Sequence, residues 1–468
     1  MESIHRNDWR DRIVGCGERL PLLDGRCVPY INFDNAATTP PLTDVLDAIL
    51  RFLPCYSSVH RGKGFKSRVS SAAYDQAHEV IARFVGADLQ TNTVIFGKNT
   101  TEAINKLTYR YPLRPDSIII STLMEHHSND LPWRRRAQVV RAGVSSDGRL
   151  DESDIDRLFE QYGDRVALLT VSGASNVTGF VQPIHRLARI AHSFGARILV
   201  DAAQLAPHRG IDMKPNNDPE HIDFVAMSAH KMYAPFGTGA LVGRKDVFLQ
   251  DAPEFRGGGT VEVVTTDEVH WAGLPDREEA GSPNVIGAVA MAAAAQVLMD
   301  TGMSAVESHE RLLTSYLLRR LRSVPGIEIF GETDPDRLED RVGVVSFNLP
   351  TQHHALVAAI LGYEAGIGVR SGCFCAQPYV ARLVGLSGEE WIKKVLERSQ
   401  RPGMVRVSFG LYNTTEEIDI LIEMLQRIAE GNYFGMYSAD GGDYAPAGTR
   451  SPIDDYVGLM LQPAVCPV

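Results

Sequence analysis

The sequence predicts an α/β protein in which helices cover both faces of a mostly parallel sheet, followed by a smaller α+β domain. Strand-like and helix-like segments alternate between residues 93 and 227, and this alternation is typical of parallel sheets built from βαβ units. With 468 residues the chain is also longer than one ordinary domain. Beyond residue 284 the alternation stops and two long helical patterns follow each other, which indicates a second domain.

The composition indicates a globular protein and excludes several classes of partner. Hydrophobic residues make up 44% of the chain and charged residues 22%. A net charge of −11 gives no basic footprint for nucleic acid or an acidic membrane surface, and no apolar run reaches the length of a membrane span. The polar start, Met1–Arg12, lacks the apolar stretch of a signal peptide, and six cysteines in so long a chain do not form a disulfide framework. We therefore expect a cytoplasmic protein.

Four regions are expected along the chain. Residues 1–30 form an N-terminal arm, and residues 31–284 form the large domain. Residues 285–430 form the small C-terminal domain, and residues 431–468 form a tail rich in Gly, Pro, Tyr and Asp. The tail is either disordered or an ordered strap over the surface, and its aromatic residues and the apolar stretch Leu459–Leu461 favour the strap at least equally.

Short apolar runs in the large domain are predicted as strands, and the amphipathic stretches between them as helices. The strands are expected at Thr93–Phe96, Ser117–Ser121, Arg165–Val171, Ala196–Val200 and Phe224–Met227. The helices between them are expected at Thr101–Tyr109, Ser128–Ala137, Ser153–Gln161 and Pro183–Phe194. Earlier in the chain, a helix starts near Thr43 and another covers Ser67–Val85. Because ligands bind beyond the carboxyl ends of parallel strands, the residues that follow each strand are candidates for a functional site.

The small domain is predicted to combine helices with short strands. Its helices are expected at Val285–Met299, Ala305–Arg322, Gln352–Leu361 and Thr415–Ala429, and its strands at Ile327–Ile329, Val342–Phe347 and Met404–Phe409. The elements do not alternate regularly, which favours an α+β arrangement.

A lysine directly after a buried strand is the most unusual feature of the large domain. The run Ile222–Met227 is short and mostly apolar, and Ser228, His230 and Lys231 follow it before Pro and Gly enforce a loop. Burial disfavours the charged form of an amine and lowers its pKa, which makes the amine a nucleophile toward a carbonyl cofactor. A lysine that merely opens a surface loop is the alternative for this stretch alone.

Three other strand ends carry polar side chains. Thr100 and Thr101 open a helix, where N–H groups and hydroxyls form either a phosphate cradle or an ordinary N-cap. His126 can stack on a flat ring or act as an acid or base. Since His126 and the adjacent His127 do not present their nitrogens to one ion, we predict no metal site. Asn176 offers a donor and an acceptor in a turn, or only shapes that turn.

A carboxylate completes the set. Asp201 ends an apolar strand, and a buried carboxylate needs a cationic partner to stay charged. A protonated pyridine nitrogen would supply this partner, and Gln204 could reach a phenolic oxygen on the same ring. A phosphate cradle, a stacking ring, a carboxylate for a pyridinium and a strand-end lysine are the parts needed to hold pyridoxal phosphate.

These residues lie in motifs that resemble the class V aminotransferase family, of pyridoxal-phosphate fold type I. Within it, the sequence is most similar to the group II cysteine desulfurases and selenocysteine lyases, from about Phe33 to Leu425. The markers are Asp34–Thr38, Val59–Gly62, Thr100–Asn105, Met124–Asn129, Val200–Pro207, His230–Tyr233, Arg256–Gly259, Ala280–Asn284, Arg370–Pro378 and Arg406–Ser408. The short spacing from Arg370 to Pro378 resembles group II rather than the longer mobile loop of group I.

The resemblance implies cofactor-binding roles for the matching positions. Lys231 would hold the cofactor and later move the Cα proton, while His126 would stack on the ring and serve in acid/base steps. Asp201 would pair with the pyridine nitrogen, and Gln204 would contact the ring oxygen. The other cofactor contacts would come from Thr100, Thr101, Asn176, Ser228 and His230, and from Ser282 of the partner subunit in a homodimer.

The resemblance also implies a substrate and a nucleophile. Arg406 and Asn176 would bind the substrate carboxylate, because a guanidinium meets a carboxylate with two parallel hydrogen bonds. His60 and Arg61 would also belong to the substrate site. Cys375 matches the family's persulfide-forming cysteine, whose thiolate attacks the substrate sulfur and leaves alanine. These roles imply a cysteine desulfurase acting on L-cysteine, with a possible sulfur-acceptor protein as partner.

One position departs from the family pattern, and alternatives stay open. Cys373 stands where many group II members carry a histidine, and a similar Cys-Phe-Cys element occurs in the desulfurase-like domain of molybdenum-cofactor sulfurases. Cys373 either shares the persulfide as a disulfide or trisulfide or is a passive core thiol. The same cofactor could also serve a C–S or C–Se lyase, an epimerase or an aminotransferase for another amino acid. A non-catalytic scaffold that kept the fold is the alternative from a different class.

Overall fold

The computed structural model describes residues 6–397, 401–448 and 457. Its largest element is a seven-stranded sheet in the order β4-β10-β9-β8-β7-β5-β6, in which β10 alone runs antiparallel to its neighbours. The strands are β4 (Asn92–Gly97), β5 (Ile118–Thr122), β6 (Gln138–Ala142), β7 (Val166–Ser172), β8 (Arg197–Asp201), β9 (Phe224–Ser228) and β10 (Gly239–Arg244). The predicted α/β fold with a mostly parallel sheet is confirmed.

Alternate residues of the central strands enter two separate hydrophobic cores, because side chains alternate across a strand. Ile118 and Ile120 of β5 pack in one core, whereas Ile119 packs in the other. Strands buried on both faces read as continuous apolar runs, which made β5, β7, β8 and β9 predictable. The edge strand β6 carries Gln138 and Arg141 and was missed for lack of such a run.

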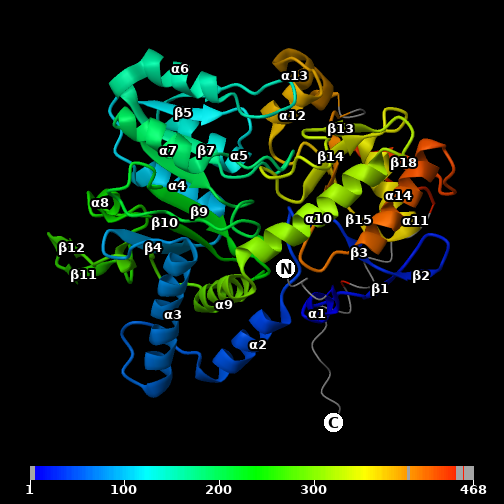
Figure 1. Cartoon of the computed structure of the whole chain (residues 1–468). Helices are drawn as coiled ribbons and strands as arrows, with labels where there is room; N and C mark the ends of the chain where they lie inside the picture. Colours follow the sequence, from blue (N-terminus) through cyan, green and yellow to red (C-terminus); the bar gives the residue numbers. More distant parts are fainter. Residues whose placement is uncertain (1–5, 398–400, 449–456, 458–468) are drawn as a thin grey trace, which may run out of the picture.

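Helices cover both faces of this sheet (Figure 1). Helix α4 lies over one face, whereas α3, α6, α7 and α9 contribute to the core on the other. Their bounds are α3 (Phe65–Phe84), α4 (Thr100–Arg110), α6 (Glu152–Tyr162), α7 (Ile184–Ser193) and α9 (Val285–Thr301). Side-chain caps fix two of the starts, since Asn99 accepts the N–H of Glu102 and Asp151 accepts that of Ser153.

The predicted helix over Ser128–Ala137 is wrong. The chain instead forms the short helix α5 (His127–Asp130) and a separate 3₁₀ turn over Trp133–Arg135, then enters β6. Pro132 lies between the two pieces, and it has no N–H to donate to a continuous helix. The fully buried Trp133 anchors the turn against the sheet.

Strand β10 was also missed, because glycines begin and interrupt its apolar run. The first of them is required by space. A Cβ on Gly239 would lie 2.5 Å from the backbone of Asn99, closer than any carbon contact allows. This close approach sets β10 against the turn that carries Thr100 and so shapes the edge of the functional site.

A second sheet of four antiparallel strands, in the order β13-β14-β17-β16, forms the other lobe. Its strands are β13 (Glu328–Phe330), β14 (Val344–Asn348), β16 (Arg370–Gly372) and β17 (Met404–Ser408). Helices α10 (Met303–Leu321), α11 (His354–Ala365) and α14 (Thr415–Ala429) pack on it around a separate core. Helix α10 crosses from the large-sheet side to this lobe in Figure 1.

Both ends of the described chain lie against the small lobe. The arm forms the hairpin β1 (Arg19–Pro21) and β2 (Cys27–Pro29), and the tail forms the hairpin β18 (Tyr437–Asp440) and β19 (Asp443–Pro446). The buried Glu364 anchors the tail, since it accepts hydrogen bonds from the Tyr437 hydroxyl at 2.9 Å and the Gly435 N–H at 3.0 Å. Of the two alternatives for the tail, the ordered strap is the one observed up to residue 448, whereas Leu459–Leu461 lies outside the described residues.

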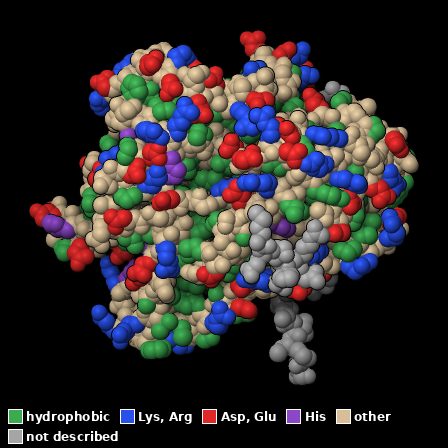
Figure 2. Space-filling view, in the orientation of Figure 1, with side chains coloured by type: hydrophobic (Ala, Val, Ile, Leu, Met, Phe, Trp, Pro, Cys, Tyr) green, Lys and Arg blue, Asp and Glu red, His purple; other side chains and the backbone are tan. Residues whose placement is uncertain are grey.

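The surface carries both signs of charge. Acidic and basic side chains are interspersed over the face shown in Figure 2. In the described part of the chain no single helix is long and apolar enough to cross a membrane. Helices α9 and α10, bent by 79° at their junction, reach that length and composition only when taken together. Half of α9 is buried in the core of the large sheet, for example at Ala288, Met291 and Ala295.

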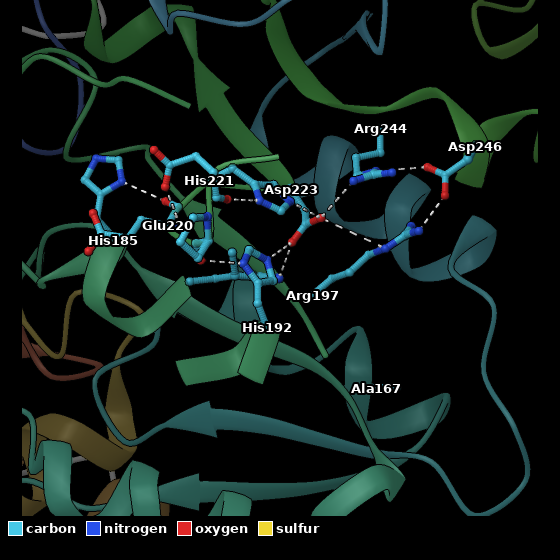
Figure 3. Close-up of polar contacts among 12 residues, drawn as sticks. Ala167, His185, His192, Arg197, Glu220, His221, Asp223, Arg244 and Asp246 are labelled. Atoms are coloured by element: carbon cyan, nitrogen blue, oxygen red, sulfur yellow. Dashed lines mark hydrogen bonds and ion pairs between the residues drawn. The ribbon is translucent and has the colours of Figure 1, made fainter. Parts of the chain in front are cut away.

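A cluster of charges around Asp223 ties α7 to the start of β9 (Figure 3). His192 contacts one carboxylate oxygen through Nε2 at 2.9 Å, and His221 contacts the other at 3.2 Å. Burial would raise the pKa of Asp223, but the two histidines and the Ile198 N–H lower it to about 2. The imidazole rings stack at 4.1 Å and only 17° from parallel, so their in-plane lone pairs do not converge on one ion. We therefore interpret the cluster as an ion-pair network.

This network predicts a pH-dependent contribution of His192 to stability. Burial alone would lower its pKa, but Asp223 raises it above the ordinary value. The stabilisation is therefore complete below about pH 6.5 and is lost as the pH rises through the raised pKa. We expect His192→Asn to lower the free energy of unfolding by about 1–3 kcal/mol at pH 6, and the difference to shrink toward pH 9. Urea titrations across this pH range measure the difference in the free energy of unfolding. His185→Asn is the control, because His185 bonds a backbone carbonyl oxygen, that of Glu220, rather than a carboxylate.

Candidate active site

A cavity of about 300 Å³ opens beyond the carboxyl ends of the parallel strands, where the small lobe meets the large sheet. Eleven of the predicted site residues line it: Thr100, Thr101, His126, Asn176, Asp201, Gln204, Ser228, His230, Lys231, Cys375 and Arg406. They come from seven segments that are distant in sequence. Parallel strands end at one edge of a sheet, which is why side chains after β4, β5, β7, β8 and β9 meet here.

Lys231 ends the 3₁₀ turn that follows β9 and is partly exposed toward the cavity. Desolvation of its amine lowers the pKa to about 8, against the opposing effect of the Asp201 charge. An amine with this pKa is partly neutral near physiological pH, and the neutral form is the nucleophile. The strand-end position that made this lysine unusual in the sequence therefore gives it a reactive amine.

Two buried groups face the cavity with unused bonding capacity. Burial raises the pKa of Asp201, whose carboxylate accepts the Ala203 N–H at 3.0 Å. A cationic N–H donor in the cavity would favour its charged form. The amide of Gln204 donates to the Ala36 carbonyl at 2.5 Å, and its Oε1 has no partner within the described chain. A bound heterocycle with a ring N–H and a donor beside it fits both groups.

The turn between β4 and α4 forms an anion cradle. The Thr100 N–H donates to Ser228 Oγ at 2.8 Å, and the hydroxyls of Thr101 and Ser128 lie 2.7 Å apart. These hydroxyls surround the N-terminus of the eleven-residue helix α4, whose dipole attracts anions. Beside them, burial and the Lys231 charge lower the pKa of His230 to about 4, so this imidazole is neutral. The cradle suits a phosphate.

His126 lies at the cavity with a defined tautomer. Its Nδ1 accepts the Ser128 N–H at 3.1 Å, so the neutral ring carries its proton on Nε2. Burial and the Lys231 charge lower its pKa to about 3. The adjacent His127 instead bonds the small-lobe loop through its N–H and Nε2. The two histidines thus contact different segments.

Glu125 was not among the predicted site residues, but its side chain supports the turn that carries His126. Its carboxyl is buried and accepts hydrogen bonds from Thr122 and Asn129 at 2.6 Å and from Ser172 at 2.9 and 3.0 Å. Burial raises its pKa to about 7 despite these donors. The bonds join β5, α5 and β7 and fix the direction in which His126 leaves β5. The sequence feature that could have indicated Glu125 is its position directly before a pair of histidines.

Arg406 on β17 brings a buried guanidinium into the cavity. Its Nη1 donates to the Asn176 carbonyl at 3.0 Å, and Nη2 contacts Asp34 at 3.2 Å. Its Nε is buried and has no partner in the described residues. Arg370, which we had placed only in a motif, also lines the cavity and pairs with Asp34 at 2.8 Å. Two guanidiniums around one small carboxylate leave donors for a second anion, such as a substrate carboxylate.

Cys375 lies on the loop between β16 and helix α12 (Gln377–Leu383). The Asn176 amide donates to the Phe374 carbonyl at 2.7 Å, and the His127 N–H donates to the Cys375 carbonyl at 2.7 Å. The Arg406 guanidinium lies over the Phe374 ring, 4.8 Å from its centre. These contacts hold the exposed Cys375 thiol at the cavity, where Lys231 also lies.

Three predicted residues lie elsewhere in the single chain. His60 and Arg61 line a second hollow of about 210 Å³ with Pro283, and Ser282 lines a third of the same size near Lys98. The structure therefore does not bring His60, Arg61 or Ser282 to the Lys231 cavity within one chain. For Ser282 this agrees with the expectation that it acts in a partner subunit.

The chain matches a known family over most of its length. Residues 31–421 match the family described as aminotransferase class V. A cysteine desulfurase of Haloferax volcanii is 36% identical over 416 residues, which cover 87% of this chain and 91% of that protein. Among solved structures, the apo cysteine desulfurase of Thermococcus onnurineus NA1 is similar, with a TM-score of 0.76, 31% identity, and coverage of 86% of this chain and 95% of that one. The cysteine desulfurase CsdA of Escherichia coli gives a TM-score of 0.75 at 29% identity, covering 92% and 100%.

Proposed function

This chain belongs to the class V aminotransferase family, and from that premise we propose that the Lys231 cavity binds pyridoxal phosphate and desulfurates L-cysteine. The chain acts as a cysteine desulfurase, which converts L-cysteine to L-alanine and keeps the sulfur as a persulfide on Cys375. The observation that carries this proposal is that the Lys231 amine and the Cys375 thiol lie in one cavity. The substrate is an amino acid, and its identification as L-cysteine follows from the relatives and from this thiol.

The residues around the cavity support the binding of pyridoxal phosphate, on which the family depends. Asp201 would hold the ring nitrogen and Gln204 the ring oxygen, because both are buried with unused bonding capacity. The hydroxyls of Thr100, Thr101 and Ser228 and the N-terminus of α4 would hold the phosphate. Bound in this way, the cofactor supplies an electron sink for the bond-breaking steps at the substrate carbon.

The chain's own residues then bind the substrate and move its protons. Arg406 binds the substrate carboxylate through the donors that Asp34 and Asn176 leave free. Lys231 takes the proton from the substrate Cα, because its amine has a pKa close to the operating pH. His126 is neutral with its proton on Nε2, so Nε2 is the atom through which it would hydrogen-bond and exchange protons with the reacting groups.

Cys375 removes the sulfur. Its thiolate attacks the substrate sulfur, so that a new S–S bond forms and the bond between this sulfur and the substrate Cβ breaks. The electron pair of the broken bond stays on the substrate carbon, which is protonated, and the molecule leaves as L-alanine. No oxidant is needed, because the carbon gains the electrons that the sulfur gives up.

We further propose a homodimer and a separate sulfur acceptor. Ser282, His60 and Arg61 lie outside the Lys231 cavity of their own chain, and in a dimer they would extend the cavity of the partner. The exposed Cys375 thiol would pass its sulfur to an acceptor protein. A reducing compartment such as the cytoplasm would keep both thiol and persulfide usable.

The proposed function predicts equal amounts of two products. The protein loaded with pyridoxal phosphate and given L-cysteine and a thiol reductant should release L-alanine and sulfide in a 1:1 ratio. Chromatography of alanine and a colorimetric sulfide assay measure the two amounts. Release of pyruvate and ammonia in place of alanine would instead indicate a C–S lyase, and an amino-group transfer product would indicate an aminotransferase.

A further inference from the structure

The loop that carries Cys375 holds a second thiol, Cys373, which the reaction above does not use. Cys375 is exposed and lines the cavity. Cys373 is half-buried, does not line the cavity, and packs against an apolar cluster that includes Tyr379 and Met404. Cys375 thus faces the cavity, whereas Cys373 lies beside it, partly within the apolar packing of the small lobe.

The backbone folds these two residues toward each other. Phe374 and Cys375 both adopt the left-handed conformation, with φ of 51° and 55°, which is strained for residues other than glycine and is typical of functional sites. The resulting turn directs the Cys375 N–H to the Cys373 thiol, and the Ala376 N–H donates to the Cys373 carbonyl at 2.9 Å. In an extended strand, residues two apart would stand about 6–7 Å from each other.

The loop is also fixed in place. The Asn176 amide holds the Phe374 carbonyl and the His127 N–H holds the Cys375 carbonyl, both at 2.7 Å. On the far side, His127 Nε2 accepts the Gln377 N–H at 3.3 Å. These bonds hold the loop that carries Cys373 and Cys375 against the residues that follow β5 and β7.

We propose that Cys373 takes the outer sulfur from the Cys375 persulfide and stores it. This inference rests on the proposed function. Cys373 gives its proton to water, and its thiolate attacks the outer sulfur. A new S–S bond to Cys373 forms, the bond between the outer sulfur and Cys375 Sγ breaks, and the electron pair of that bond leaves with Cys375 as a thiolate. The sulfur keeps its oxidation state, so no oxidant or reductant takes part.

The transfer has a measurable consequence. Once Cys375 is a free thiolate again, a second L-cysteine can react before any acceptor arrives. A chain with both thiols therefore forms two molecules of alanine in its first burst, whereas a chain without Cys373 forms one. Burial raises the pKa of the Cys373 thiol, although the hydrogen bond from the Cys375 N–H lowers it. The second alanine should therefore form faster as the pH rises from 7 to 9, because more Cys373 is thiolate.

The experiment counts alanine per chain in the burst. The protein loaded with pyridoxal phosphate is mixed with excess L-cysteine, without any added reductant or acceptor protein, and quenched before the L-cysteine thiol can remove the sulfur. We expect two alanines per chain for the wild type and one for Cys373→Ser and Cys373→Ala. Cys55→Ser is the matched control, since Cys55 lies outside the cavity, and it should give two. The visible absorbance of the cofactor shows that each variant is folded and loaded.

Mass spectrometry of the alkylated peptide that spans Ser371–Arg382 locates the sulfur. One extra sulfur on each of Cys373 and Cys375 supports the proposal. Two alanines from Cys373→Ser, or a wild-type burst of one with sulfur on Cys375 alone, would overturn it and leave the desulfurase function intact. A peptide that loses two hydrogens while free sulfide appears would also overturn it, because this means a disulfide in place of storage. No alanine from the wild type would instead refute the proposed function itself.

Discussion

Replacing Lys231 with alanine is expected to lower alanine formation from L-cysteine by about 10³-fold or more, the effect of losing a positioned acid–base and nucleophilic group. Among the residues that line the cavity, Lys231 is the only amine. The guanidiniums of Arg370 and Arg406 cannot replace it, because a delocalised guanidinium is a poor nucleophile. Alanine release at saturating pyridoxal phosphate measures the loss, and the visible absorbance of the mixture shows whether the cofactor is still held in its protein-bound form.

The pKa of Lys231 adds a second readout. The neutral amine captures the cofactor, so reconstitution of the apo protein should accelerate as the pH rises through about 8. The rate of absorbance change after mixing apo protein with pyridoxal phosphate between pH 6 and pH 9 measures this. Lys394→Ala is the control, because this exposed lysine on α13 (Gly388–Leu396) lies away from the cavity. A Lys231→Ala variant that keeps the protein-bound absorbance and still turns over would refute the assignment. A wild type that is inactive and shows no protein-bound absorbance would instead favour a non-catalytic scaffold.

The sequence predicted those parts of the site that follow from strand order. Asp201 ends β8, Asn176 and His126 lie in the turns that follow β7 and β5, and parallel strands of one sheet end at one edge. Apolar runs locate such strands, so the positions of these side chains could be read without a structure. Lys231 was predictable for the same reason, because it follows the apolar strand β9 and therefore lies at the same edge of the sheet.

Other parts of the site depend on contacts that no local pattern encodes. Asn176 holds the Phe374 carbonyl across 198 residues of sequence, and only the resemblance to a family pointed to Cys375. The pairing of Asp34 with both Arg370 and Arg406 was missed because it joins a short strand of the N-terminal region to the small sheet. Strand β10 was missed for a different reason. It begins at Gly239, which must lack a side chain in order to pack against Asn99, so no apolar residue marks the start of the strand.

Replacing Cys375 with alanine is expected to lower desulfuration of L-cysteine by about 10²–10⁴-fold, as for the loss of a catalytic nucleophile. Cofactor binding should stay intact, because the cofactor contacts come from the strand ends of the large sheet rather than from this loop. The loop itself should keep its shape, since the bonds from Asn176 and His127 go to backbone carbonyls of Phe374 and Cys375, which alanine retains. Alanine and sulfide release, with the cofactor absorbance as the folding control, measure the effect.

This variant separates the two chemistries that one cavity could support. Lys231 and Asp201 would serve any reaction of the proposed cofactor that labilises the Cα proton of an amino acid, so their presence does not choose a reaction. A lyase expels sulfide or selenide directly and needs no thiol, so Cys375→Ala would leave its rate nearly unchanged. A desulfurase must carry its sulfur on Cys375, because the fixed loop presents this exposed thiol to the cavity. The choice of reaction thus lies in the small lobe, with the thiol, and the choice of cofactor lies in the large sheet, with the lysine.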